Sequence, residues 1–222
     1  MIPPQHNSEF VAAMEDVLEL YRQPYDPALP MVCMDEHPMQ LQRDVRPPIP
    51  ATAEHPQRID YEYERAGTAS VFMVCEPLAG WRQVNARAQR TKVDWATTIA
   101  TLLDTRYQSV QRLRLVCDNL NTHTPGAFYE TFAPAQARAY VQRLEFHYTP
   151  KHGSWLNIAE CELSALTRQC VAHRRIDDLA KLQMEIQAWA DATNHQQRGV
   201  LWQFNVHDAR HKLHFLYPKI LI

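Results

Sequence analysis

The pattern of hydrophobic and polar positions along the chain predicts short buried strands alternating with amphipathic helices. Apolar runs or strict alternation predict strands at residues 31–34, 59–64, 70–75, 81–85, 113–117 and 144–148. Helical spacing of apolar positions predicts helices at residues 10–21, 91–104, 155–171 and 177–194, with one or two shorter ones between 126 and 141. A turn around Gly67 is expected to separate the second and third strands, and the proline-rich residues 43–55 to form an irregular loop. This order predicts an α/β fold, a mixed sheet flanked by helices.

Composition narrows the class of protein. The chain has 222 residues, of which 45% are hydrophobic, and its formal net charge is −2. It is therefore neither a disordered tail nor a strongly basic arm, and any nucleic-acid binding has to come from local basic clusters. No apolar run approaches the roughly 20 residues that span a bilayer. The histidines and cysteines lack the spacing of a zinc site.

Two of the predicted strands stop at an aspartate. The apolar run VCM precedes Asp35, and the run LVC precedes Asp118. If these strands are neighbours, their last residues lie roughly 5 Å apart, within reach of one hard cation. Two close carboxylates are costly unless a metal ion neutralises them, although a lone aspartate at a strand end often only caps a turn. A third carboxylate from a helix would complete a site for one or two Mg²⁺ ions, which suits phosphodiester chemistry.

Two longer blocks carry a resemblance to a known family. Residues 118–123 (DNLNTH) and residues 147–160 (HYTPKHGSWLNIAE) closely resemble blocks of bacterial insertion-sequence transposases in the mariner-like branch of the DDE (Asp-Asp-Glu) superfamily. Residues 209–213 (ARHKL) and 216–218 (LYP) also resemble that family's C-terminal end, so the similarity runs from about Met31 to Pro218.

The resemblance implies an RNase H-like fold, dependence on Mg²⁺ or Mn²⁺ with two ions expected, and cut-and-paste DNA transposition. By motif position it implies that Asp35, Asp118 and Glu160 bind the metal and are catalytic. Expected partners are double-stranded DNA, as transposon ends and target, and a second copy of the chain in a homodimer. The expected location is the bacterial cytoplasm, associated with the nucleoid.

Two nearby glutamates compete for these roles. Glu162 lies two residues after Glu160, about 200° around the helix, so only one of them can face the aspartates. Both lie near an edge of the apolar stripe, and periodicity does not choose between them; the family's Asn-x-x-acid motif, read from Asn157, favours Glu160. Glu36 competes with Asp35 but is expected to point to the opposite face of the sheet.

Several polar residues are candidates for DNA contact. In the blocks that carry the resemblance, Asn119 and His123 are expected to orient the aspartate or a scissile phosphate, and Lys151 and His152 to contact the DNA backbone. Arg174 and Arg175 form a basic cluster that could bind phosphates. For each of these residues, a hydrogen bond within its own loop or a solvated surface charge is the competing interpretation.

The predicted organisation has three parts. Residues 1–30 are expected to be a helix and proline-rich linker, either the remnant of the helix-turn-helix region that full-length relatives carry or an ordinary helix packed on the core. Residues 31–195 are expected to form the catalytic domain and residues 196–222 a C-terminal extension. Two other functions stay open: a catalytically silent DNA-binding or dimerisation module, and an RNase H-type nuclease that cuts RNA–DNA hybrids.

Overall fold

The computed structural model describes residues 2, 7–172 and 174–218, and at its centre is one mixed five-stranded sheet. The strand order is β3-β2-β1-β4-β5; β1, β2 and β3 are antiparallel neighbours, whereas β1, β4 and β5 run parallel. The strands are β1 (Met31–Asp44), β2 (Tyr63–Glu76), β3 (Trp81–Arg87), β4 (Leu113–Asp118) and β5 (Leu144–Thr149). The predicted mixed sheet is confirmed.

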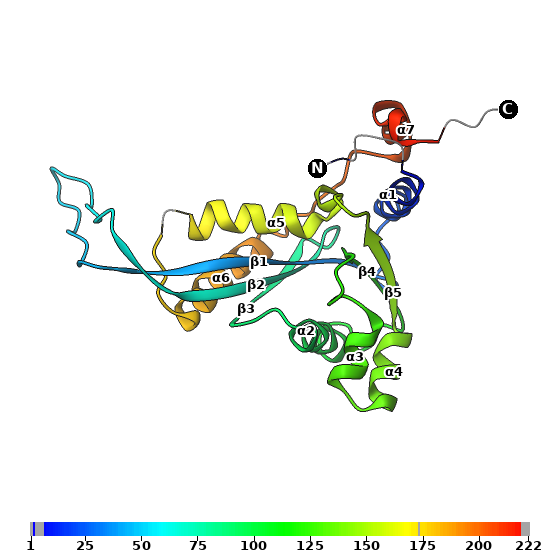
Figure 1. Ribbon diagram of the computed structural model, residues 1–222, viewed down its shortest axis with the longest axis horizontal. Coiled ribbons are helices and arrows are strands. Elements are labelled where there is room, and N and C mark those ends of the chain that lie inside the picture. The colour runs from blue at the N-terminus through cyan, green and yellow to red at the C-terminus, as the bar shows by residue number, and fades with distance from the viewer. Residues whose placement is uncertain (1, 3–6, 173, 219–222) are drawn as a thin grey trace.

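Helices cover both faces of this sheet (Figure 1). One face carries α2 (Lys92–Asp104), α3 (Pro125–Thr131) and α4 (Pro134–Gln142). The other carries α5 (Ile158–Leu166), which continues into a π-helical turn at Thr167–Val171, and α6 (Leu179–His195). Short 3₁₀ turns lie at Ser154–Leu156 and His214–Leu216.

The period-2 alternation of the strands divides the interior into two cores. On β1, Cys33 packs with α5 and α6, whereas its neighbours Val32 and Met34 pack with α2 and α3. The inner part of β1 and the end of β4 are therefore covered on both sides, which explains why residues 31–34 and 115–117 are continuous apolar runs.

The hairpin of β1 and β2 is longer than the sequence predicts. The strand expected at residues 31–34 continues to Asp44, and β2 runs from Tyr63 through Gly67 without the expected turn. Gly67 adopts a φ of 114°, and the register shifts between Leu41 and Gln42, so a bulge takes up the irregularity. Most side chains in this outer part are solvent-exposed, so the sequence there lacks the alternation of apolar and polar residues that predicts a strand. In Figure 1 this hairpin reaches far beyond the layered body.

Both ends of the described chain pack on the core under α5 and α6. Helix α1 (Ser8–Tyr21) buries Phe10, Met14 and Val17 there, which supports the interpretation of residues 10–21 as a helix packed on the core. Helix α7 (Val206–Lys212) lies beside α1, and Arg210 donates two hydrogen bonds of 2.9 Å to Glu15. In the part of the chain that the structure describes, no helix is long and apolar enough to cross a membrane.

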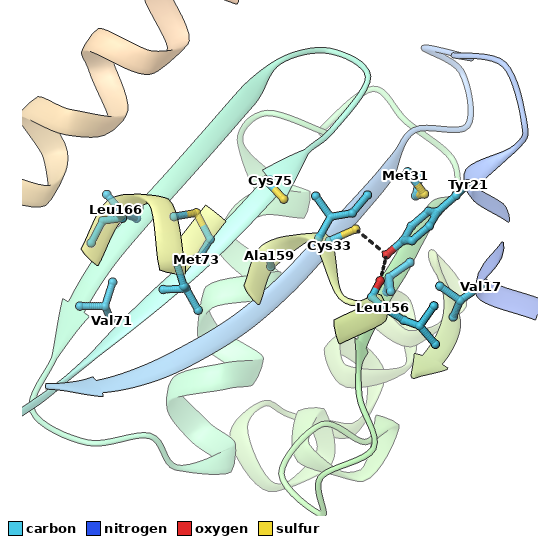
Figure 2. Close-up of a cluster of buried hydrophobic side chains, with 14 of the residues drawn as sticks. Val17, Tyr21, Met31, Cys33, Val71, Met73, Cys75, Leu156, Ala159 and Leu166 are labelled. Atoms are coloured by element: carbon cyan, nitrogen blue, oxygen red, sulfur yellow. Dashed lines mark hydrogen bonds between the residues drawn. The ribbon is translucent and has the colours of Figure 1, made fainter. Parts of the chain in front are cut away.

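Tyr21 joins α1 to the centre of the fold (Figure 2). Its buried hydroxyl donates a 2.7 Å hydrogen bond to the carbonyl of Leu156, in the turn before α5, and lies 3.5 Å from the Cys33 thiol on β1. One side chain thus connects the N-terminal helix, the central strand and the start of α5.

We expect Tyr21→Phe to lower the free energy of unfolding by about 1–2 kcal/mol, because it leaves the buried Leu156 carbonyl without its donor. Denaturant unfolding followed by circular dichroism measures the loss. Tyr61→Phe, at a side chain 86% exposed, is the control and should change little. Equal losses in the two variants would contradict a specific role for the Tyr21 hydroxyl.

Candidate active site

Asp35 lies within β1, which continues to Asp44, and Asp118 lies at the end of the adjacent parallel strand β4. Cys33 on β1 is in register with Val116 on β4, and the two aspartates follow two residues later on each strand. Because side chains alternate along a strand, both aspartates project to the face covered by α5. The prediction that these two strands are neighbours is confirmed.

The two strands separate just before the aspartates. The β1–β4 ladder ends at Cys33 and Val116, whereas β1 stays paired with β2 and β4 stays paired with β5 as far as Asp118. We call this opening between β1 and β4, beyond Cys33 and Val116, the fork. A cavity of about 430 Å³ lies beside it, lined by Asp35, Glu36, His37, Asp118, Ser154, Glu160, Leu163, Ser164, Thr167 and Arg168.

Asn157 fixes the start of α5 against the fork. Its side-chain oxygen accepts a hydrogen bond from the Ala159 backbone N–H and caps the helix, and its amide donates to the carbonyl of Met34 at 2.8 Å. Met34 immediately precedes Asp35, so this one buried side chain ties the first turn of α5, which contains Glu160, to the strand that carries the aspartate.

The two competing glutamates of α5 have different surroundings. Glu160 is exposed and lines the cavity, whereas Glu162 is buried. Glu162 accepts two 2.9 Å hydrogen bonds from the Arg82 guanidinium of β3, and Arg198 adds a third at 3.0 Å. The carboxylate of Glu162 is therefore committed to an internal ion pair, and the structure leaves Glu160 as the α5 glutamate beside the aspartates.

Glu36 points away from Asp35, as expected, and contacts His123. The Nε2 atom of His123 lies 2.9 Å from Glu36 Oε1, and Nδ1 lies 2.5 Å from Asp118 Oδ1. Burial alone would lower the pKa of His123, but its contacts with Asp118 and Glu36 raise that pKa to about 9. The side chain of His123 is fully buried and lies against Asp118, a position that fits the first of its two expected roles, orienting the aspartate.

The carboxylates repel one another in a partly desolvated site. Burial raises the pKa of the Asp35 carboxyl to about 7, and the negative charges of Asp118, Glu36 and Glu160 add to the increase. The backbone N–H of Glu36 donates a hydrogen bond to Asp35, which lowers the pKa and offsets part of this increase. The Oδ1 atom of Asp118 is buried, and its partner is the His123 ring, whose Nδ1 atom lies 2.5 Å away.

Such a group of oxygen donors fits a hard divalent cation. A cation would compensate the repulsion among these carboxylates. Within residues 2, 7–172 and 174–218, no three His, Cys, Asp or Glu side chains converge closely enough to hold an ion as they stand. The three carboxylates line one cavity without closing on one point.

The remaining predicted site residues lie around this cavity or next to it. Asn119 and Lys151 are exposed just beyond the ends of β4 and β5, and His152 is exposed with a φ of 67°. Arg174 and Arg175 line a neighbouring cavity of about 640 Å³, where they pair with Glu185 and Asp44. This second cavity shares His37 and Thr167 with the first, but none of the three carboxylates lines it.

Residues 30–183, more than half of the chain, match the family model of the DDE superfamily endonucleases. The chain belongs to this family. Among curated proteins none matches the sequence.

Solved structures of the Mos1 mariner transposase share the fold. The Mos1 paired-end complex with Mn superposes with a TM-score of 0.57 at 13% identity, over 96% of this chain and 63% of that chain. The paired-end complex with the left transposon end has a TM-score of 0.56 at 13% identity, over 89% of this chain and 62% of that chain. The paired-end complex with Mg has a TM-score of 0.54 at 14% identity, over 99% of this chain and 66% of that chain. This DDE family member therefore has the RNase H-like fold of Mos1, and it spans less than two thirds of the first two Mos1 chains.

Several residues of the candidate site were not predicted from the sequence. Ser154 and Arg168 line the cavity, but neither follows a strand end, and their positions depend on the path of α5. The anchoring role of Asn157 could have been inferred, because an asparagine directly before a helical pattern is a strong N-cap signal. The contact of Glu36 with His123 joins residues 87 positions apart and leaves no local signal.

We expect Glu162→Gln to destabilise the protein by about 3 kcal/mol, because it leaves the buried Arg82 guanidinium without a full counter-charge. Glu160→Gln, on the same helix but exposed, should leave stability nearly unchanged. Thermal and denaturant unfolding of the two variants compare them directly. A larger loss in Glu160→Gln would show that the two glutamates have been assigned the wrong way round.

We expect Asp35→Asn to stabilise the metal-free protein at pH 8. A carboxyl with a raised folded-state pKa binds more protons when folded, so stability falls as pH rises between about 4, the unfolded value, and about 7. Removing the charge should recover on the order of 1–3 kcal/mol above pH 7, and the gain should vanish towards pH 4. Chemical unfolding in chelator across this range measures it. The exposed Asp191→Asn is the control, and a loss of stability at pH 8 in Asp35→Asn would contradict the repulsion.

Proposed function

We propose that this chain is the catalytic domain of a DNA transposase, which cleaves and joins DNA strands with divalent metal ions held by Asp35, Asp118 and Glu160. The observation that carries the proposal is the cavity beside the fork, where these three carboxylates from β1, β4 and α5 line one space. Membership of the DDE endonuclease family and the blocks at residues 118–123 and 147–160 support it.

The chain's own residues supply geometry and charge to this site. Asp35 and Asp118 are held by paired strands, and Glu160 by a helix whose first turn is tied to β1 through Asn157. Asp35, Asp118 and Glu160 would hold Mg²⁺ or Mn²⁺, as one ion or a pair, and the metal would supply activation of the attacking water or 3′-hydroxyl and stabilisation of the leaving oxygen. The carboxylates orient the reacting groups, and no covalent protein nucleophile is required.

Double-stranded DNA is the proposed substrate. Asn119, Lys151 and His152 lie on the loops that border the carboxyl ends of β4 and β5, and Arg168 lines the cavity itself. We propose that these residues bind the DNA backbone, and that Arg174 and Arg175 extend the contact along the neighbouring cavity. Mos1 is described in paired-end complexes and with a left transposon end; by analogy, transposon ends and a homodimer are proposed here.

The proposal is tested by nicking of supercoiled plasmid DNA with Mn²⁺ or Mg²⁺. We expect metal-dependent nicking that falls at least 100-fold in Asp35→Asn, Asp118→Asn and Glu160→Gln alike, since each removes a ligand of the same site (about 3 kcal/mol of barrier). Asp191→Asn on the surface of α6 should nick like the wild-type chain.

Three outcomes separate the alternatives. Undiminished nicking in Asp118→Asn would exclude the proposed site. A wild-type chain that binds no Mn²⁺ in calorimetry would favour the silent DNA-binding or dimerisation module. Preferential cutting of an RNA–DNA hybrid over duplex DNA would favour the RNase H-type nuclease.

A further inference from the structure

The fork creates a mechanical problem for any site built across it. The pairing of β1 with β4 ends at Cys33 and Val116, and Asp35 and Asp118 both lie beyond it. Their like charges push the two strands apart. Some other contact has to hold the ends of the fork at a fixed separation.

His123 spans the fork from the side opposite α5. Through its two ring nitrogens it contacts Asp118 at the end of β4 (2.5 Å) and Glu36 on β1 (2.9 Å). The imidazole is 0% exposed and the Glu36 side chain only 5%, so little water competes for the Glu36 contact.

The surroundings fix the imidazole in this position. The ring stacks on Trp95 of α2, with centroids 5.3 Å apart and planes 22° from parallel. The His123 backbone carbonyl accepts a 2.9 Å hydrogen bond from the hydroxyl of Tyr148 on β5, and the backbone N–H donates to the carbonyl of Leu120. Ring plane and backbone are both set, so the distance between Glu36 and Asp118 is set as well.

We propose that Glu36 and His123 are positioning residues, and that the Glu36–His123–Asp118 bridge holds the two aspartate-bearing strands at the separation a metal ion needs. This deepens the proposed function. It gives Glu36, which directly follows Asp35, a role on the far side of the strand instead of a place among the metal ligands. Outer contacts of this kind typically change metal affinity 10- to 100-fold.

The bridge is tested by measuring the Mn²⁺ affinity of the full chain and its variants by calorimetry. Glu36→Met removes the acceptor at similar volume, and should weaken Mn²⁺ binding at least 10-fold. Glu36→Gln keeps a carbonyl oxygen for His123 and should fall between Glu36→Met and the wild type. His123→Asn keeps a donor near the Asp118 position but no longer reaches Glu36. In that background Glu36→Met should therefore cause no further loss.

The same experiment separates the bridge from direct metal ligation by Glu36. A direct ligand predicts that Glu36→Met weakens Mn²⁺ binding equally in the wild-type and His123→Asn backgrounds, and this result would overturn the proposal. Wild-type affinity in Glu36→Met would overturn it too. Phe128→Leu, in the core beside Trp95, is the control for general destabilisation: it should lower Tm and leave Mn²⁺ affinity unchanged.

A metal-free measurement keeps the test decisive if His123→Asn does not fold or the chain binds no Mn²⁺. The bridge predicts that Glu36→Met lowers Tm in chelator by about 3–6 °C, and Glu36→Gln by less. A carboxylate that only repels its neighbours predicts a rise in Tm for both variants, which would refute the bridge. Absence of Mn²⁺ binding would instead count against the proposed function alone.

Discussion

Carboxylates of like charge have to be held close together where little water screens them, and the rest of this structure depends on that constraint. Repulsion between Asp35 and Asp118 destabilises the folded state, and other contacts of the fold have to offset it. Hydrogen-bonded strands provide such contacts on the outer sides, where β2 supports β1 and β5 supports β4. Between β1 and β4 the pairing ends before the aspartates, and side-chain contacts hold the two strands in place there.

The side-chain supports come from both faces of the sheet. On the α2 face the imidazole of His123 lies between Glu36 and Asp118. On the α5 face Asn157 holds the helix to the Met34 carbonyl, and Tyr21 holds the preceding turn through the Leu156 carbonyl. Deeper along α5, the Glu162–Arg82 ion pair fixes the rotation of the helix, so that Glu160 faces the cavity. These contacts join segments far apart in the sequence, and together they determine where three charges lie.

What could be predicted from the sequence follows from how local each signal is. The strands that carry Asp35 and Asp118 were predictable because an apolar run that stops at a carboxylate needs no knowledge of the partner strand, but the continuation of β1 past Asp35 to Asp44 was not. The choice between Glu160 and Glu162 depended on a motif, since both border the same apolar stripe; the physical reason is Arg82, 80 residues away on β3. The burial of His123 and the extent of the β1–β2 hairpin were missed. The first depends on Trp95 and Glu36, and the second on backbone pairing that leaves side chains in water.

Helix α5 carries two carboxylates of opposite character within one turn, and this has a consequence for how copies of such a sequence decay. Loss of a carboxylate at the cavity abolishes the proposed chemistry and relieves repulsion, so the altered chain still folds and persists. Loss of Glu162 leaves the buried guanidinium of Arg82 without a counter-charge, and the destabilised chain is removed by unfolding and proteolysis. Copies released from selection for activity should therefore lose the cavity acids first and keep Glu162 longest. The order in which acidic positions disappear among degenerate copies then records which of them served the fold.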